Sequence, residues 1–328
     1  MNYKFTIDPV VFNIFNLHIM FKYLLVYLSV VLFSFQLLSG SNIASRSSDS
    51  NGRVKKISYQ LANPSEDYVL VVAHRGDWRN APENSLQAIK NCIEMGVDIV
   101  EIDVRMTKDS ILVLMHDKTI DRTTNGKGNI SDWTWDDLKN VHLKDVNGMT
   151  TTHKIPTLEE AMQVAKGNIM VNLDKCSGYM DLAFEVIDET ATIDQVIFKG
   201  SKSIDQVKDQ YGDLLEKIIY MPIIKKSTPH LNGFVDDFIT ELNPLAFEVI
   251  YTSDDSPMFE VIKSIKKAGC RIWVNTLWES LCGDHTDDLA MSDPDGAWGW
   301  VIENGANIIQ TDRPGLLLKY LREKGLHD

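Results

Sequence analysis

Positive charge is scarce in this sequence of 328 residues, in which 33 lysines and arginines stand against 46 aspartates and glutamates. The formal net charge is −13 at pH 7. Nucleic acids and anionic membrane surfaces bind proteins through clustered positive charge, so the composition argues against both as partners. A small anionic substrate is still compatible with it, because one metal ion and one arginine can reverse the field inside a pocket.

Cysteine and paired histidine are scarce as well. The four cysteines, Cys92, Cys176, Cys270 and Cys282, show no C-x-x-C spacing, which argues against a thiolate metal site. We expect buried free thiols, and a Cys270–Cys282 bridge is the alternative if the protein is exported. No two histidines are closely spaced, which disfavours a zinc hydrolase. No basic helix or long exposed apolar loop is evident, which favours soluble substrates.

An extended apolar run lies near the N-terminus, at residues 24–38. A short basic start at Met20 precedes it and small residues follow it, which is typical of a signal peptide, and the run is short for a spanning helix. We interpret residues 1–45 as a signal-peptide region with its true start at Met20, so that the protein is exported, periplasmic or extracellular, without stable membrane insertion after processing. The alternative is an uncleaved membrane anchor through 24–38. Residues 46–66 are predicted to be a linker and residues 67–325 one barrel domain.

Strand and helix patterns alternate along the rest of the chain, which predicts an α/β fold. Nine strand candidates are present, one more than a closed eight-stranded barrel needs. We expect an irregular TIM (β/α)8-type barrel with one strand short or outside it, and a small insertion after the third strand, at about residues 117–157. The link at residues 106–110 is too short for a helical crossover and predicts a hairpin. A turn centred on residues 108–109 would place His116 opposite Glu101.

Three predicted strands end on side chains that can perform chemistry. The first ends on His74 and Arg75, the second carries Glu101 and Asp103, and the third ends on His116. Glu101 and Asp103 are two residues apart, so both carboxylates point to the same side of their strand. A lone histidine or arginine is more often structural than catalytic, but unpaired charge inside an apolar strand is costly. Because catalytic groups gather at the carboxyl ends of strands in parallel barrels, the pattern predicts a catalytic site.

These residues and their order resemble the glycerophosphodiester phosphodiesterase family of the phospholipase C-like phosphodiesterase superfamily. The matching motifs follow in family order over roughly residues 69–322: His74-Arg75-Gly76, Pro82-Glu83-Asn84-Ser85, Glu101-x-Asp103, His116-Asp117, Arg122-Thr-Thr-x-Gly126-x-Gly128, Ile155-Pro156-Thr157-Leu158-Glu159-Glu160 and Thr311-Asp312-Arg313-Pro314. The resemblance implies a barrel and the metal-dependent hydrolysis of glycerophosphodiesters, which are small molecules, to glycerol 3-phosphate and an alcohol. The alternatives are another polyol, inositol or lipid phosphodiester as substrate, or a non-catalytic barrel that binds phosphorylated ligands.

The resemblance also implies roles for the residues at the strand ends. His74 and His116 would exchange acid and base roles, and Arg75 would grip the phosphate with its guanidinium. Glu101, Asp103 and a third carboxylate would hold one divalent cation, Ca²⁺ or Mg²⁺, for which oxygen ligands are suited.

The fourth predicted strand departs from the family pattern, which has Glu-x-Lys there with the glutamate as a metal ligand. We place Asp174 at the ligand position, with Asn172, on the same face, as the competing register. Lys175 then falls one residue early for the family lysine and on the other face. Lys199, at the end of the next strand, is the candidate to replace that lysine in contacting phosphate, and a solvated strand end is the alternative.

Five further residues are candidates for supporting the site. Glu83 is either a partner of Arg75 or of the metal, or a first-turn carboxylate at a helix N-terminus. Asn84 is interpreted as the cap of that helix. Trp273 and Trp278 lie on opposite faces of a regular strand, so one belongs to the core and the other is a candidate for packing on substrate. The resemblance gives Asp312 a supporting role under the site.

Overall fold

The computed structural model describes residues 52–64 and 67–328. The expected signal-peptide region, residues 1–45 with Met20 and the run at 24–38, lies outside these described residues. Within them, no helix combines the length and the apolar character that crossing a membrane requires. All four cysteines are buried free thiols, as the sequence predicts.

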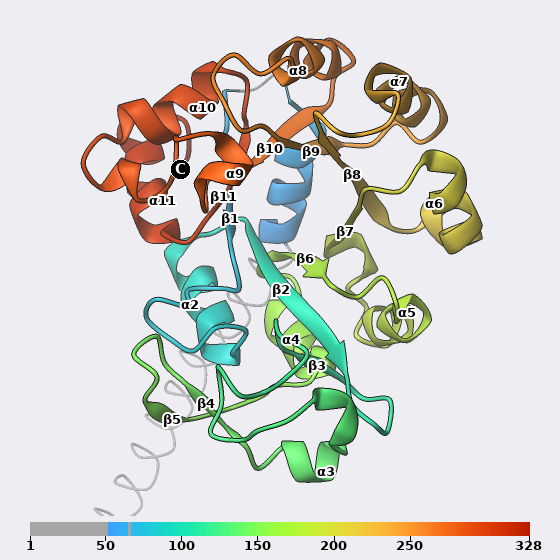
Figure 1. The fold of residues 1–328 in the computed structure, drawn as a ribbon, viewed down its shortest axis with the longest axis vertical. Coiled ribbons are helices and arrows are strands. Elements are labelled where there is room, and N and C mark those ends of the chain that lie inside the picture. The colour runs from blue at the N-terminus through green and yellow to red at the C-terminus, as the bar shows by residue number, and fades with distance from the viewer. Residues whose placement is uncertain (1–51, 65–66) are drawn as a thin grey trace, which may run out of the picture. The chain divides into compact units, whose positions relative to one another are not determined.

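Eight parallel strands form a closed barrel with helices around it (Figure 1). The hydrogen-bonded order is β1-β2-β6-β7-β8-β9-β10-β11, and β11 pairs with β1 to close the ring. The strands are β1 (Leu70–Ala73), β2 (Ile99–Met106), β6 (Met170–Asp174), β7 (Val196–Gly200), β8 (Ile219–Lys225), β9 (Ala246–Ile250), β10 (Arg271–Asn275) and β11 (Ile308–Thr311). The expected (β/α)8-type barrel is confirmed.

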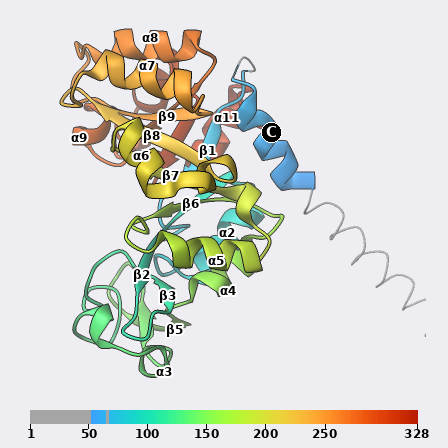
Figure 2. The same ribbon diagram turned by 90° about the vertical axis from the view of Figure 1, so that its right-hand side faces the viewer.

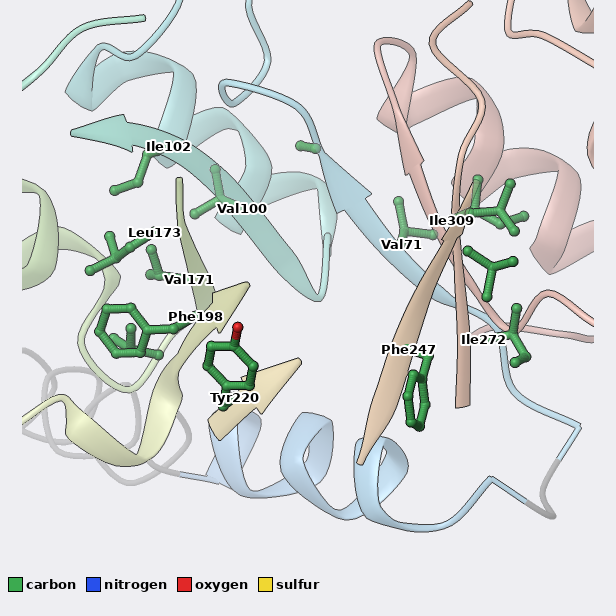
Figure 3. Packing of buried hydrophobic residues seen from close by; sticks show 14 of the residues in the cluster. Val71, Val100, Ile102, Val171, Leu173, Phe198, Tyr220, Phe247, Ile272 and Ile309 are labelled. Carbon is green, nitrogen blue, oxygen red and sulfur yellow. The ribbon is translucent and has the colours of Figure 1, made fainter. Parts of the chain in front are cut away.

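The main core lies between the barrel and its helices. Outward-facing strand residues such as Val171, Phe198 and Phe247 belong to this core (Figure 3). The helices are α2 (Leu86–Met95), α4 (Leu158–Ala165), α5 (Met180–Glu189), α6 (Ile204–Tyr211), α7 (Leu231–Glu241), α8 (Met258–Lys267), α9 (Glu279–Cys282), α10 (Trp300–Glu303) and α11 (Pro314–Glu323), with short 3-10 turns at Ile193–Gln195, Gly212–Glu216 and Leu289–Met291 and a π turn at Asp295–Gly299.

The ninth predicted strand is β3 (Leu112–Leu114), which lies outside the barrel and pairs antiparallel with β2. The expected hairpin is present, but its register differs by one residue, because Val104 faces Leu114. The turn holds three residues rather than two, and its last residue, Ser110, adopts the left-handed φ of 66° that three-residue hairpin loops require. The prediction that His116 lies directly opposite Glu101 is therefore wrong by one residue.

The segment expected as an insertion at about 117–157 folds around a small core of its own. It contains a 3-10 turn at Ile130–Asp132, α3 (Trp135–Leu138) and the two-stranded sheet of β4 (His142–Lys144) and β5 (Thr150–Lys154). Its core consists of Val113, Met115, Ile120, Ile130, Leu138, Val141, Leu143 and Ile155. Figure 2 shows α3, β3 and β5 together at one side of the barrel, away from α7 and α8.

Of the segment predicted as a linker, residues 46–66, the structure describes residues 52–64, and most of these are helical. Residues 52–62 form a helix, and its apolar residues Val54, Ile57 and Leu61 are buried. They pack against the first interior-facing residues of several strands, in a cluster with Leu70, Ile99, Met170, Ala246 and Ile308. Apolar side chains at this helical spacing can bury one face against the barrel interior, so the helix closes the amino-terminal end of the barrel.

Candidate active site

The interior face of the barrel changes from apolar to polar side chains along β2. Glu101 and Asp103 share the interior face of β2 with Ile99, and they pair with Asn172 and Asp174 on β6. Strand alternation therefore carries these side chains into the carboxyl-terminal end of the barrel, opposite the closing helix.

Glu101, Asp103 and Asp174 form a carboxylate cluster whose possible ligand oxygens all lie within 4.8 Å of one another. Glu101 and Asp103 are only 2% and 1% exposed. Burial, followed by the charges of Asp103 and Asp174, raises the pKa of Glu101 well above its usual value. Three close carboxylate oxygens are the donor set that Ca²⁺ and Mg²⁺ prefer, so these residues fit a divalent cation. Asp174, placed at the ligand position from the sequence, belongs to the cluster.

Lys175 reaches the same cluster, which corrects the expectation that it faces away. Its Nζ lies 3.0 Å from Asp103 Oδ1 and 3.3 Å from Asp174 Oδ2. Strand β6 ends at Asp174, and Lys175 adopts a left-handed φ of 58°. The strand rule for alternating faces stops applying at that residue, so the lysine turns back toward the barrel mouth.

Lys199 lies inside the barrel and is not a solvated strand end. Its Nζ is 2.7 Å from Glu248 Oε2 and 3.5 Å from Gln310 Oε1, and it lies 4.5 Å from the centre of the Trp273 ring. Trp273 is fully buried and is therefore the core tryptophan of the predicted pair. Asn172 is also fully buried, and its Nδ2 donates to the carbonyl of Ile197.

The His74 ring is fixed at the end of β1 by Asp312. The distance from His74 Nδ1 to Asp312 Oδ1 is 2.8 Å, and Trp78 Nε1 donates to the same oxygen over 2.7 Å. Burial alone would raise the pKa of Asp312, but the hydrogen bonds from His74 and Trp78 outweigh it and lower the pKa. Asp312 thus stays ionised and leaves His74 Nε2 as the nitrogen available for proton transfer.

A chain of charged side chains links His116 to Arg75 across the mouth. His116 Nδ1 is 2.6 Å from Asp117 Oδ1, and Arg122 Nε donates to Asp117 Oδ2 over 2.8 Å. Arg122 also donates to both carboxylate oxygens of Glu83, which accepts from Arg75 Nη1 over 3.2 Å. Glu83 is therefore the partner of Arg75 rather than a first-turn carboxylate, since no acidic residue lies in the first turn of α2.

Arg75 is held over the carboxylates by an unusual backbone. Its φ is 54°, and its backbone N–H donates to Glu101 Oε2 over 2.8 Å, while its Nε lies 3.6 Å from Asp103 Oδ2. The next residue, Gly76, also has a positive φ, and a Cβ there would lie 2.8 Å from the Cβ of Ala88. In the His-Arg-Gly sequence, His74 and Arg75 are the reactive residues. Gly76 follows them because only glycine fits this close turn.

The interpretation of Asn84 as a helix cap is wrong, because Ser85 caps α2 by accepting the N–H of Ala88. Asn84 instead makes two hydrogen bonds with Asp103. Its Nδ2 donates to Asp103 Oδ2 over 2.9 Å, and its Oδ1 accepts the backbone N–H of Asp103 over 3.0 Å. Trp278, the second predicted tryptophan, is 47% exposed and presents its ring edge-on to His74, with the ring centres 6.0 Å apart.

Comparison with known proteins points to the same segment of the chain. A family model described as the glycerophosphoryl diester phosphodiesterase family matches residues 74–211, which include every member of the carboxylate cluster. A second model, described only as a domain of unknown function, matches residues 220–321. The resemblance predicted from the sequence motifs is thus confirmed over residues 74–211, which match the family model.

Similar proteins extend the likeness beyond the matched segment. A glycerophosphodiester phosphodiesterase of Caldanaerobacter subterraneus subsp. tengcongensis is 29% identical over 78% of the chain and 99% of its own length. Glycerophosphodiester phosphodiesterase 1 of Homo sapiens is 40% identical over 61% of the chain, which spans 56% of that protein. A crystal structure of a glycerophosphoryl diester phosphodiesterase from Parabacteroides distasonis superposes with a TM-score of 0.67 at 27% identity, over 83% of the chain and 92% of that structure.

Several residues of this site were not assigned to it from the sequence. Asp117 and Arg122 stand in the motifs that carried the resemblance, so they could have been assigned. Lys175 and Asn84 depend on left-handed backbone conformations, for which a single sequence gives little signal. Asp287, buried below Asp312, accepts the backbone N–H of Asp312 over 2.7 Å.

Proposed function

We propose that the chain hydrolyses glycerophosphodiesters to glycerol 3-phosphate and an alcohol, with one divalent cation, Ca²⁺ or Mg²⁺. The buried carboxylate cluster at the barrel mouth carries this proposal, because His74, His116 and Arg75 surround it. The names of the relatives support the same substrate class. The substrate in this proposal is a small-molecule phosphodiester, and nucleic acid is not a partner.

Glu101, Asp103 and Asp174 would hold the cation, which when bound supplies positive charge against the anionic phosphate. Arg75 is positioned to add a second positive charge from the side of the cluster, and its guanidinium can meet two phosphate oxygens at once. Glu83 and the backbone contact to Glu101 hold Arg75 in place. Phosphoester cleavage of this kind depends on charge already positioned for the transition state.

The two histidines would move the protons. One imidazole removes the proton of the attacking hydroxyl, which by family resemblance is the neighbouring glycerol hydroxyl, and the other protonates the departing alkoxide. A cyclic phosphate results, and water opens it with the two roles exchanged. Burial, although opposed by Asp117, lowers the pKa of His116 and so favours the neutral base at neutral pH.

We also propose that the protein is exported, on the basis of the sequence pattern at residues 20–45 alone. The mature form would be periplasmic or extracellular, and the alternative is an anchor through residues 24–38. N-terminal sequencing of protein recovered from the extracytoplasmic fraction tests this. A mature chain that retains residues 24–38 in the membrane fraction would establish the anchor.

The activity is tested by measuring glycerol 3-phosphate release from a panel of headgroups that includes choline, ethanolamine, inositol and glycerol. EDTA-treated protein is compared before and after addition of Ca²⁺ or Mg²⁺. His116→Ala is expected to lose most of the metal-dependent release, and His153→Ala, in β5 of the insertion, is the matched control. No release from folded protein with any headgroup or cation would contradict the proposal.

A further inference from the structure

A buried ion pair lies inside the barrel next to the carboxylate cluster. The Nζ of Lys199 is 2.7 Å from Glu248 Oε2, and the two side chains are only 6% and 5% exposed. The catalytic scheme above assigns no role to either residue. A buried pair of this kind seldom adds net stability over apolar residues, so its presence points to another purpose.

Strand register places Lys199 beside the cluster. Leu173 on β6 pairs with Phe198 on β7, so the next residues along these two parallel strands are Asp174 and Lys199. Burial alone would raise the pKa of Asp174, but the charges of Lys199 and Lys175 outweigh burial and lower it. The ammonium of Lys199 is thus close enough to act on the cluster electrostatically.

Glu248, the partner of Lys199, is itself held in place by hydrogen bonds on its other side. Its second oxygen, Oε1, accepts from Asn275 Nδ2 over 2.9 Å, and Asn275 Oδ1 accepts from Trp273 Nε1 over 2.7 Å. The Trp273 ring lies next to the ammonium and adds a cation–π contact. Both Glu248 and its support come from β9 and β10, on the other side of Lys199 from β6.

The contrast with Lys175 shows what a less restrained lysine does at this cluster. Lys175 places its Nζ on Asp103 and Asp174 directly. A lysine side chain is flexible, and its three donors can turn to any nearby carboxylate. Lys199 would have the same option if Glu248 did not hold it.

We propose that Glu248 is a positioning residue of the cation site, which keeps the Lys199 ammonium off Glu101 and Asp174 so that Lys199 does not compete with a divalent cation for their oxygens. The inference rests on the proposed function, because it takes the carboxylate cluster as a cation site. It adds that cation affinity is set by residues of β7 and β9 that do not bind the cation themselves.

Calorimetric titration of EDTA-treated protein with Ca²⁺ and with Mg²⁺ tests this without an activity assay. Glu248→Gln leaves the lysine charge uncompensated and is expected to weaken cation binding by about tenfold or more. Lys199→Met removes the competing charge, so its affinity should equal or exceed that of the wild type. The double variant should return to within about threefold of the wild type, because the two effects oppose each other. Glu241→Gln, which neutralises an exposed partner of Lys208, is the matched control.

A purely structural role for the pair predicts a different pattern, in which both single variants bind the cation more weakly and the double variant does not recover. That pattern, or a Glu248→Gln variant that binds as tightly as the wild type, overturns the inference. Thermal unfolding checks that each variant is folded. Should Glu248→Gln fail to fold, Glu248→Asp retains the charge with a shorter reach and is expected to weaken binding by a smaller factor. Wild-type protein that binds neither cation would instead overturn the cation site of the proposed function.

Discussion

The two ends of the barrel interior are built from the same strands but by opposite chemistry. At the amino-terminal end, Leu70, Ile99 and Met170 meet the helix at residues 52–62 in a fully apolar cluster. Two residues further along β2 and β6, the same interior face carries Glu101 and Asn172. One strand thus contributes to stability with one side chain and to the site with the next side chain on that face.

This difference has an energetic consequence. Each apolar side chain buried at the closed end stabilises the fold by about 1.5–3 kcal/mol. At the mouth, buried polar atoms cost free energy unless they are paired. Asn172 Oδ1 and Arg75 Nε are buried there without a hydrogen bond, within the described part of the chain. We therefore expect the closed end to determine stability and the mouth to determine activity, and substitutions can separate the two.

The largest effect is expected from Glu101→Gln. Removal of one carboxylate from the cluster should reduce glycerol 3-phosphate release by at least about a hundredfold, since charge stabilisation of the transition state is lost. Burial and its acidic neighbours raise the pKa of Glu101, so the charged form is unfavourable in the folded, metal-free protein. The free energy of unfolding in urea at neutral pH should therefore stay equal or rise. A variant that loses stability together with activity would contradict the division between a stabilising closed end and an active mouth.

At the closed end, Leu61→Ala should have the opposite effect. Truncation of this fully packed leucine should lower the free energy of unfolding by about 2–5 kcal/mol, through lost burial and the cavity left behind. Its folded fraction should release glycerol 3-phosphate at the wild-type rate, because the side chain lies far along the barrel from the cluster. Lys55→Ala, exposed on the same helix, is the control. A loss of activity in folded Leu61→Ala would show that the two ends are coupled.

Asp312→Asn tests whether the contact that orients His74 serves activity more than stability. An amide cannot supply the negative charge that holds the His74 ring, and activity is expected to fall by about ten- to a hundredfold. The pH profile should change shape, while the unfolding free energy should fall by less than in Leu61→Ala. Asp288→Asn, which removes an exposed partner of Arg313 nearby, should leave both unchanged. Equal losses in the two variants would assign the effect to the local fold instead of His74.

The barrel itself could be predicted from the sequence, because strand alternation and helix periodicity are local signals. All nine strand candidates are strands, and the side chains at their ends do converge at one mouth. The carboxylate pair at Glu101 and Asp103 was predictable for the same reason, since a two-residue spacing fixes a common face.

The features that could not be predicted are those that tertiary contacts decide. A left-handed φ costs a non-glycine residue about 1–2 kcal/mol, and tertiary packing can impose it at Arg75, Asn84 or Lys175 without a signal in the sequence. Another left-handed residue, Ser110 in the hairpin turn, accompanies the shift of the β3 register by one position. The helix at 52–62 did carry an apolar spacing, but a polar segment this short gains its stability only from the barrel that it closes.

The smallest effect concerns the charged chain between the mouth and the insertion. Hydrogen bonds from Arg122, which outweigh the effect of burial, hold the pKa of Asp117 below its usual range. Because the folded-state pKa lies below the unfolded value of about 4, the stabilising contribution of Asp117 is complete above that pH and is lost as the pH falls further. Asp117→Asn should therefore lower the unfolding free energy by about 1 kcal/mol or less from pH 5 to pH 7, since the group is partly exposed. The gap between wild type and variant in urea unfolding should begin to narrow as the pH falls below about 4. A gap that widens there would show that Asp117 stabilises the fold by packing and not by charge.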